Sequence, residues 1–362
     1  MGFKCGIVGL PNIGKSTLFN LLTKGNSAVA NFPFCTIEPN IAKVSVLDER
    51  LNRLANIVLP KKIIHASIEF IDIAGLVKGA AQGEGLGNQF LNNIRETNAI
   101  AHVVRCFQDN KISHVYDDIK PERDIEIINT ELILSDLDVC EKHLLKYKKK
   151  TTLRTQDVQK KINILEKCIK HLTQCLMLKN LNLNLDERNT ISSLRLLTLK
   201  PTMYIANMNE EKESLLLLKK VYHIAKKENA PVIPISANLE LDLIKMNEIE
   251  KKSFMKVFNI KSLGLNNIIS AGYQLLKLIT FFTVGKKEIR AWPILDGSTS
   301  LQAAHKIHTD FSKGFIRVQI IKYNDFIKYK NEVKIRELGK CTKEGKNYKI
   351  EDGDIVHFLF NV

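Results

Sequence analysis

The sequence has no long hydrophobic run and no paired cysteines. No apolar stretch approaches the roughly 18–20 residues that a membrane-spanning helix needs, and the N-terminus becomes glycine-rich before a signal-peptide core develops. The seven cysteines never form the C-x₂-C pairs of zinc or redox sites, which favours free thiols. We therefore expect a cytoplasmic protein with no membrane partner and no cysteine-based metal site.

Linkers and repeats are also missing. The 362 residues contain no Pro-rich or Gly-rich connector, no low-complexity tract and no internal repeat. Single hydrophobic cores stop growing near about 250–300 residues, so a chain of this length is expected to form two or three domains. Because no linker separates them, we expect these domains to be joined tightly.

Acidic residues are in short supply. The 39 Asp and Glu face 54 Lys and Arg, which gives a net charge of +15 and a pI near 9.3. Lys and Arg gain affinity by releasing counterions from phosphates, so this surplus favours a polyanionic partner, above all RNA. Mutational bias toward Lys, Asn and Ile would produce the same charge without selection for binding, and charge alone leaves both explanations open.

The first half of the chain alternates strand and helix patterns. A strand pattern over residues 4–8 leads through a glycine turn into a helical pattern over 15–23. Such alternation predicts an α/β fold with a doubly wound, mostly parallel sheet. Further strands are expected at 66–71, 101–107, 202–205 and 232–235.

Between about 133 and 179, apolar residues recur at alternating spacings of four and three in two consecutive series. These series predict two amphipathic helices packed as an antiparallel coiled-coil hairpin. Residues 141–180, which we call the basic arm, carry eleven Lys or Arg against three acids. Pairing between two chains would satisfy the same pattern, but two adjacent series fit an internal hairpin better, so we expect a monomer.

Strand patterns return beyond about residue 277 and predict a small, half-exposed mixed sheet in a separate domain. This region contains no recognisable catalytic constellation. His305, His308 and Asp310 lack a third metal ligand at a suitable spacing, so roles in a turn or in the core are expected for them.

Gly9-Leu10-Pro11-Asn12-Ile13-Gly14-Lys15-Ser16 is a complete G-x-x-x-x-G-K-S phosphate loop between the first strand and the first helix. Its glycines let the backbone N–H groups converge on phosphates. Lys15 is expected to neutralise the β/γ charge and to act in catalysis. The Ser16 hydroxyl is expected to ligate Mg²⁺.

Two further segments complete the expected triphosphate site. Asp72-Ile73-Ala74-Gly75 follows an apolar strand, where Asp72 can hold Mg²⁺ through water and the Gly75 N–H can meet the γ-phosphate. Alone, D-x-x-G is a common turn, and its position downstream of a phosphate loop gives it weight. Thr36 is the expected second hydroxyl ligand of Mg²⁺, in a segment ordered by the γ-phosphate. The alternative for Thr36 is an ordinary Pro-containing loop.

The base-recognition segment departs from the GTPase pattern N-K-x-D, because Asn207-Met208-Asn209-Glu210 stands in its place. Glu210 is one methylene longer than the Asp that pairs with guanine, and Met208 offers no cation over the base. A mismatched hydrogen-bonding site can cost factors on the order of 10⁴, so we expect ATP to be preferred. A GTPase translation factor is the alternative. Ser236 and Ala237 are expected to form the second base-side loop.

Leu76 stands where Ras-like enzymes carry the glutamine that orients water, so slow intrinsic hydrolysis is expected. His114 is our candidate for a replacement because imidazole can orient water near neutral pH. A solvated loop histidine is the alternative. His102 falls within a strand pattern and is expected in the core. The glycine-rich segment 79–87 is read either as a mobile switch or as a plain flexible loop.

These features together resemble the YchF/Obg-like ATPase family over essentially the whole chain. The resemblance implies an Obg-type G domain at 1–132 and 200–277, a coiled-coil insertion at 133–199 and a C-terminal β-grasp TGS domain at 278–362. It also implies ATP preference and association with the ribosome. The segments that carry it are 4–19, 31–40, 70–95, 200–210, 308–311 and 314–317.

Carried onto this sequence, the family's nucleotide loop falls on Asn12, Ile13, Gly14, Lys15, Ser16 and Thr17, and its Mg²⁺ ligands fall on Ser16 and Thr36. We therefore expect a Mg²⁺-dependent ATPase that acts as a nucleotide-dependent switch on the ribosome, with rRNA contacts through the basic arm and the TGS domain. An adaptor whose nucleotide mainly stabilises the fold is the alternative, which Leu76 permits.

Overall fold

The computed structural model describes residues 3–24, 40–73, 86–109, 114–116, 118–149, 156–258, 260 and 262–361. The chain forms two compact units. The N-terminal unit comprises Lys4–Lys43 and Glu69–Gly272, and the C-terminal unit comprises Met1–Phe3, Val44–Ile68 and Tyr273–Val362. Thr36, Gly75, Leu76 and most of the predicted switch at 79–87 lie outside the described residues.

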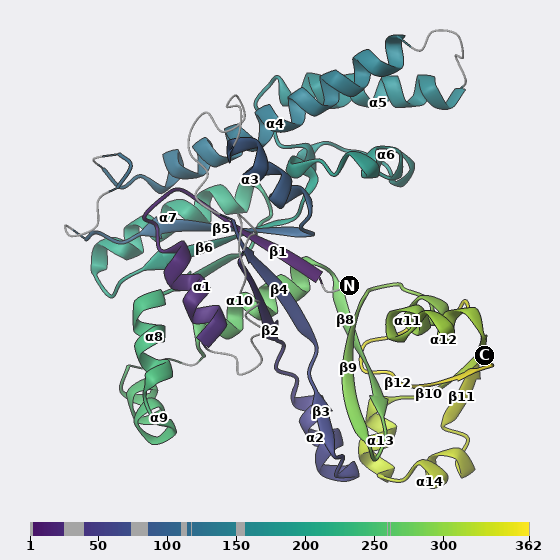
Figure 1. The fold of residues 1–362 in the computed structure, drawn as a ribbon. Coiled ribbons are helices and arrows are strands. Elements are labelled where there is room, and N and C mark those ends of the chain that lie inside the picture. The colour runs from purple at the N-terminus through teal and green to yellow at the C-terminus, as the bar shows by residue number, and fades with distance from the viewer. Residues whose placement is uncertain are drawn as a thin grey trace. The chain divides into compact units, whose positions relative to one another are not determined.

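The sheet of the N-terminal unit has the strand order β2-β4-β1-β5-β6-β7 (Figure 1). The neighbours β1, β5, β6 and β7 run parallel, which confirms the predicted doubly wound, mostly parallel architecture. Because β5 is buried along its whole length, its near-continuous apolar sequence is that of a central parallel strand. The bounds are β1 Phe3–Val8, β2 Asn40–Ser45, β4 Ser67–Asp72, β5 Ala99–Cys106, β6 Thr202–Met208 and β7 Val232–Ile235.

Helices cover both faces of this sheet (Figure 1). On one face, apolar side chains of α4 and α7 pack with those of β5 and β6 in one core cluster. On the other face, α1 packs against α8. The bounds are α1 Lys15–Lys24, α3 Leu86–Arg95, α4 Pro121–Lys149, α5 Gln156–Leu172, α6 Leu185–Ile191, α7 Lys212–Lys227, α8 Ala237–Lys245, α9 Glu248–Val257 and α10 Gly264–Leu275, with short 3₁₀ turns η1 Leu178–Asn180, η2 Ser192–Leu194 and η3 Leu197–Leu199.

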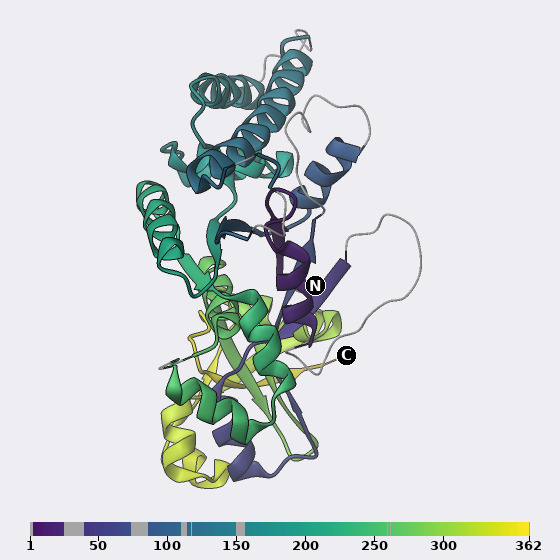
Figure 2. The ribbon, with the colours of Figure 1, turned by 90° about the vertical axis from the view of Figure 1, so that its left-hand side faces the viewer.

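The predicted hairpin is present: α4 and α5 lie side by side and extend beyond the sheet of their unit in both views (Figures 1 and 2). The expectation that the helical pattern extends to about residue 179 is wrong, because α5 ends at Leu172, and Leu176, the last apolar residue of the second series, is exposed. Cys175 adopts a left-handed backbone with φ of 57°, which interrupts a right-handed helix. The first helix begins earlier than expected, so its initial turns belong to the core of the unit.

The C-terminal unit is built on a mixed sheet of order β11-β10-β12-β8-β9-β3. The pairs β8–β9, β10–β11 and β10–β12 are antiparallel, whereas β12–β8 and β3–β9 are parallel. The bounds are β3 Lys62–Ile64, β8 Leu278–Val284, β9 Glu288–Leu295, β10 Phe315–Ile321, β11 Cys341–Glu344 and β12 Ile355–Phe360, with α2 Glu49–Val58, α11 Ser300–Ile307, α12 Thr309–Lys313, α13 Tyr323–Tyr329 and α14 Glu332–Glu337.

The expectation of a half-exposed sheet is wrong, because a core cluster lies on each face. One cluster joins Phe281 and Trp292 to α11, and the other joins Phe282 and Ile289 to α2, α13 and α14. The helix α2 and the strand β3 come from residues 49–64, which sequence analysis placed with the first domain and did not recognise as structured elements. Leu51, Leu54 and Ala55 of α2 are spaced as on one face of a helix, but nothing in the sequence shows that this face packs against β9.

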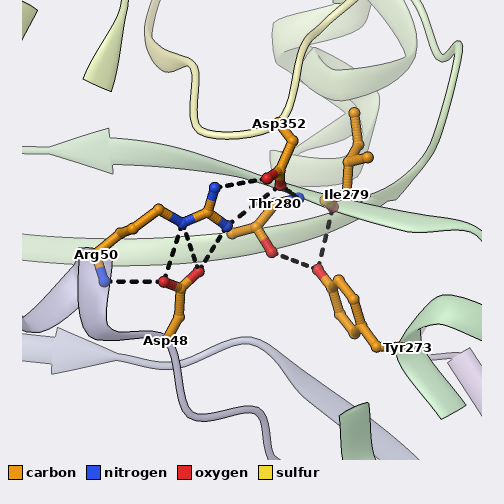
Figure 3. Close-up of polar contacts among 6 residues, drawn as sticks. All are labelled: Asp48, Arg50, Tyr273, Ile279, Thr280 and Asp352. Carbon is orange, nitrogen blue, oxygen red and sulfur yellow. Dashed lines mark hydrogen bonds and ion pairs between the residues drawn. The ribbon is translucent and has the colours of Figure 1, made fainter. Parts of the chain in front are cut away.

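A polar cluster fastens this early segment within the C-terminal unit (Figure 3). The Arg50 guanidinium lies 2.8 Å from the Asp48 carboxylate and 2.6 Å from that of Asp352. The Asp352 carboxylate in turn accepts a hydrogen bond from the Thr280 N–H at 2.8 Å, and the Thr280 hydroxyl contacts the Tyr273 hydroxyl. Residues of α2 and of the C-terminal strands therefore share one network.

Among the described helices, none is long and apolar enough to cross a membrane.

Candidate nucleotide-binding site

The predicted phosphate loop connects the end of β1 to the start of α1. Gly9 has a φ of 151°, and an added Cβ would lie 2.3 Å from Ile13 Cδ1 and 2.7 Å from Val103 O. No side chain fits there, so the glycine is required by the close approach of the loop to β5. Because α1 begins at Lys15, the unpaired N–H groups of its first turn open onto the loop, which suits an anion.

Asn207 brings the predicted binding segments together at one edge of the sheet. From the end of β6, its Nδ2 donates to Ile13 O at 3.0 Å and its Oδ1 accepts from Ala237 N at 3.3 Å. Gly14, at φ of 94°, makes room for this amide, since an added Cβ would lie 2.2 Å from Asn207 Nδ2. The phosphate loop, the base-recognition segment and the loop before α8 are therefore neighbours.

Lys15 is held inside the loop. Its ammonium donates to Gly9 O at 2.9 Å and to Leu10 O at 2.6 Å. Burial lowers the Lys15 pKa to about 8, and the nearby Asp72 carboxylate opposes that shift. The side chain is thus preorganised beside the positions where phosphate oxygens would meet the loop.

Asp72, at the end of β4, has the surroundings of a cation ligand. Its Oδ1 is buried and makes no hydrogen bond within the described part of the chain. Burial raises the Asp72 pKa, and Lys15 lowers it. A buried carboxylate oxygen without a partner carries a desolvation cost that a hard cation would remove. Ser16, exposed in the first turn of α1, offers a hydroxyl of the predicted kind, and Thr17 beside it is half-buried.

The two altered base-recognition residues are placed differently. Met208 packs with the core cluster beneath α4 and α7, on the face of the sheet opposite to Asn207, so its side chain does not join Asn207 at the phosphate loop. Glu210 is exposed just beyond β6. Asn209, which sequence analysis passed over, accepts hydrogen bonds from Glu211 N and the Ser214 hydroxyl and so fixes the turn that presents Glu210.

A buried glutamate secures the second base-side loop. Ser236 lies at the N-cap position of α8 without a capping bond from its hydroxyl, and Ala237 is buried behind it. One turn later, the Glu240 carboxylate accepts from Gly264 N and from Leu265 N at 3.0 Å, which caps α10. Burial raises the pKa of Glu240. The role of Glu240 could not be predicted from the sequence, because its partners lie more than twenty positions away.

His114, the predicted water-orienting residue, has a buried side chain in the approach to α4. Its Nε2 lies 3.1 Å from Asp124 Oδ2, and its Nδ1 lies 3.0 Å from Tyr116 O. Among the described residues, its side chain contacts Tyr116 and Asp124 and not the phosphate loop. Arg105, also missed, supports the preceding segment: its Nε donates to Phe107 O at 3.1 Å and a terminal nitrogen donates to Asp109 O at 3.2 Å.

His102 and His308 behave as expected, whereas His305, expected in a turn or in the core, is exposed on α11. His102 is buried in β5 against the Tyr204 ring, and burial lowers its pKa to about 3, which confirms its place in the core. His308 caps α12 by accepting from Asp310 N, a role in a turn. Six cysteines of the described region are free thiols, and Cys35 lies outside that region.

Comparisons with known proteins agree with this arrangement. A family model described as a 50S ribosome-binding GTPase matches residues 4–135, and the YchF-GTPase_C model, described as a protein of unknown function, matches residues 278–361. The ribosome-binding ATPase YchF of Buchnera aphidicola subsp. Acyrthosiphon pisum is 71% identical, and that of Escherichia coli O157:H7 is 54% identical, each over the full length of both chains.

The solved structure of the Schizosaccharomyces pombe YchF GTPase superposes with a TM-score of 0.86 at 40% identity and covers 99% of this chain and 98% of its own. Both units, the phosphate loop and the helical hairpin are thus accounted for by one full-length likeness, and the chain belongs to the YchF family.

Proposed function

We propose that this protein is a Mg²⁺-dependent ATPase that acts as a nucleotide-dependent switch on the ribosome. The observation that carries the proposal is the tie made by Asn207, which holds an altered guanine-recognition segment against a complete phosphate loop. The curated relatives named above are called ribosome-binding ATPases, whereas the fission-yeast structure and one family model carry the word GTPase. Glu210 and Met208 favour ATP.

The chain's own groups account for binding. Lys15 and the N–H groups of the phosphate loop bind the β- and γ-phosphates, and Ser16, Thr36 and Asp72 hold Mg²⁺, which neutralises charge on the phosphates when bound. Gly75 meets the γ-phosphate through its N–H. Met208 affects base preference because it stands where the GTPase pattern has a lysine over the base, not because it contacts the base itself. Ser236 and Ala237 border the base.

Hydrolysis is slow because Leu76 cannot orient water. His114 supplies this function from the segment before α4. The switch follows from differential binding: ATP orders the segments around Thr36 and Gly75, ADP does not, and the two states present different surfaces to the ribosome. The basic arm and the TGS surface contact rRNA, and the protein acts as a monomer in the cytoplasm.

Nucleotide preference tests the proposal. Binding of ATP and GTP analogues is titrated with Mg²⁺ for the native protein and for a Met208→Lys, Glu210→Asp double variant, which restores the guanine pattern. We expect a clear ATP preference in the native protein that the double variant weakens. Equal or tighter binding of the GTP analogue by the native protein would place it among the GTPases instead.

A further inference from the structure

Both ring nitrogens of His114 are already occupied by protein groups. Nε2 faces the Asp124 carboxylate at 3.1 Å, and Nδ1 faces the Tyr116 main chain, 3.0 Å from its O and 3.2 Å from its N. The side chains of His114 and Asp124 are each only 4% exposed. An imidazole needs an available nitrogen to hold a water molecule, so this position of the ring is not one from which it orients a nucleophile.

We propose that Asp124 is a positioning residue that holds His114 in a resting place, and that this contact opens before His114 takes part in ATP hydrolysis. The inference rests on the proposed catalytic role of His114. It gives a second reason for slow intrinsic turnover. The first is that Leu76 stands in place of the glutamine that orients water.

The Asp124 carboxylate is only partly hydrogen-bonded in this contact. The Asp124 Oδ1 makes no hydrogen bond in the described part of the chain, and its neighbour Arg123 Nε lies 3.7 Å away. The terminal nitrogens of the Arg123 guanidinium bind Asp118, so Arg123 is shared between the two carboxylates. Burial raises the pKa of Asp124, while His114 and Arg123 oppose the shift. Because one oxygen of this buried carboxylate lacks a hydrogen bond, the desolvation cost of Asp124 is only partly offset, and its contact with the ring is less stable than a fully hydrogen-bonded pair.

The helix that carries Asp124 also reaches the basic arm. It lies in the first turn of α4, and the same helix runs without interruption to Lys149 in the basic arm. Midway, the buried Asp136 carboxylate accepts from Leu197 N and Thr198 N at 2.9 and 2.7 Å and pairs with Arg95 at 3.1 Å. One rigid helix therefore connects the surface proposed for RNA to the residue that holds His114.

The test measures both the exposure of His114 and turnover. Diethyl pyrocarbonate modification of His114 is followed by peptide mass spectrometry in the native protein, in Asp124→Asn and Asp124→Ala, and in Asp138→Asn. Asp138 provides the control because it is a carboxylate of the same helix α4 that pairs with Lys142 and has no contact with Arg123 or His114 among the described residues. We expect modification roughly tenfold faster in the Asp124 variants, the factor that a hydrogen bond to a charged group contributes, and no change in the control.

Steady-state ATP hydrolysis should show a several-fold higher kcat in Asp124→Asn with an unchanged KM, and adding His114→Ala should abolish the gain. An unchanged rate of modification in both Asp124 variants overturns the inference. So does a fall in kcat, which would mean that the carboxylate assists the histidine. If His114 becomes exposed but His114→Ala alone hydrolyses ATP at the native rate, it is the proposed role of His114 that fails.

Discussion

At the scale of single residues, the phosphate loop depends on the space around two glycines. Gly14→Ala would add a Cβ 2.2 Å from Asn207 Nδ2 at a φ of 94°, so we expect it to break the tie between the loop and β6 and to lower ATP-analogue affinity at least tenfold. Gly345→Ala is the matched control, because nothing lies within 4 Å of its added Cβ. Titration calorimetry compares the two, and equal affinities would contradict this account.

Residues of the loop could be predicted because phosphate chemistry imposes a local backbone. Gly9, Gly14 and Lys15 are recognisable from spacing alone, and the structure places them as that spacing demands. The placement of Met208 and His114 could not be predicted in this way. Whether Met208 faces the base or the core depends on which face of β6 it occupies, and the burial of His114 depends on a carboxylate ten positions away.

At the scale of elements, the basic arm combines a strong periodicity with an uneven distribution of charge. Its apolar seam could be predicted because heptad spacing is a local signal, but its continuity with the core could not, since the initial turns of α4 pack on β5 and α7. Some arm lysines are neutralised within the protein: Lys148 lies 2.8 Å from Glu166, and Lys179 lies 2.7 Å from Glu228. Others remain exposed.

Neutralising exposed arm lysines should weaken ribosome binding. Replacing three of them with Gln should lower affinity and reduce the slope of log K against log salt by about two to three, because each phosphate contact contributes roughly 0.7–0.9. Co-sedimentation at several salt concentrations, with ADP and with an ATP analogue, measures both effects. The arm lysines are Lys146, Lys160 and Lys170, and the control lysines, exposed on α7, are Lys219, Lys226 and Lys227.

Equal losses in the arm and control variants would show that net charge alone governs binding. A slope that is lowered only by the arm variant, and more strongly with one nucleotide than with the other, fits the switch. Identical affinities of the native protein with ADP and with the ATP analogue would instead favour an adaptor.

At the scale of the whole molecule, the C-terminal unit needs a segment that the sequence places far from it. Leu54 in α2 is fully buried against the cluster containing Phe282 and Ile289. Leu54→Ala should destabilise this unit by about 2–5 kcal/mol. The single tryptophan, Trp292, lies in the same unit, so its fluorescence during urea unfolding reports the change.

Leu47→Ala is the control, because Leu47 belongs to the same segment but is 69% exposed. If Leu54→Ala leaves the urea midpoint of the Trp292 fluorescence transition unchanged, α2 is not part of this core. The contribution of α2 could not be foreseen from composition or periodicity: its partners follow it by more than two hundred residues, and a ten-residue helix carries too little pattern to identify them.

The split origin of the C-terminal unit affects how the protein is made. Residues 44–68 leave the synthesising ribosome long before residue 273 appears. At about 5–20 residues per second, the delay is on the order of ten to forty seconds. Throughout that interval the apolar face of α2 lacks its native partners on β8, β9, α13 and α14, while the strands on either side of the segment can already join the first sheet. The nascent chain must therefore shelter this face by transient packing or with a chaperone until the last quarter of translation.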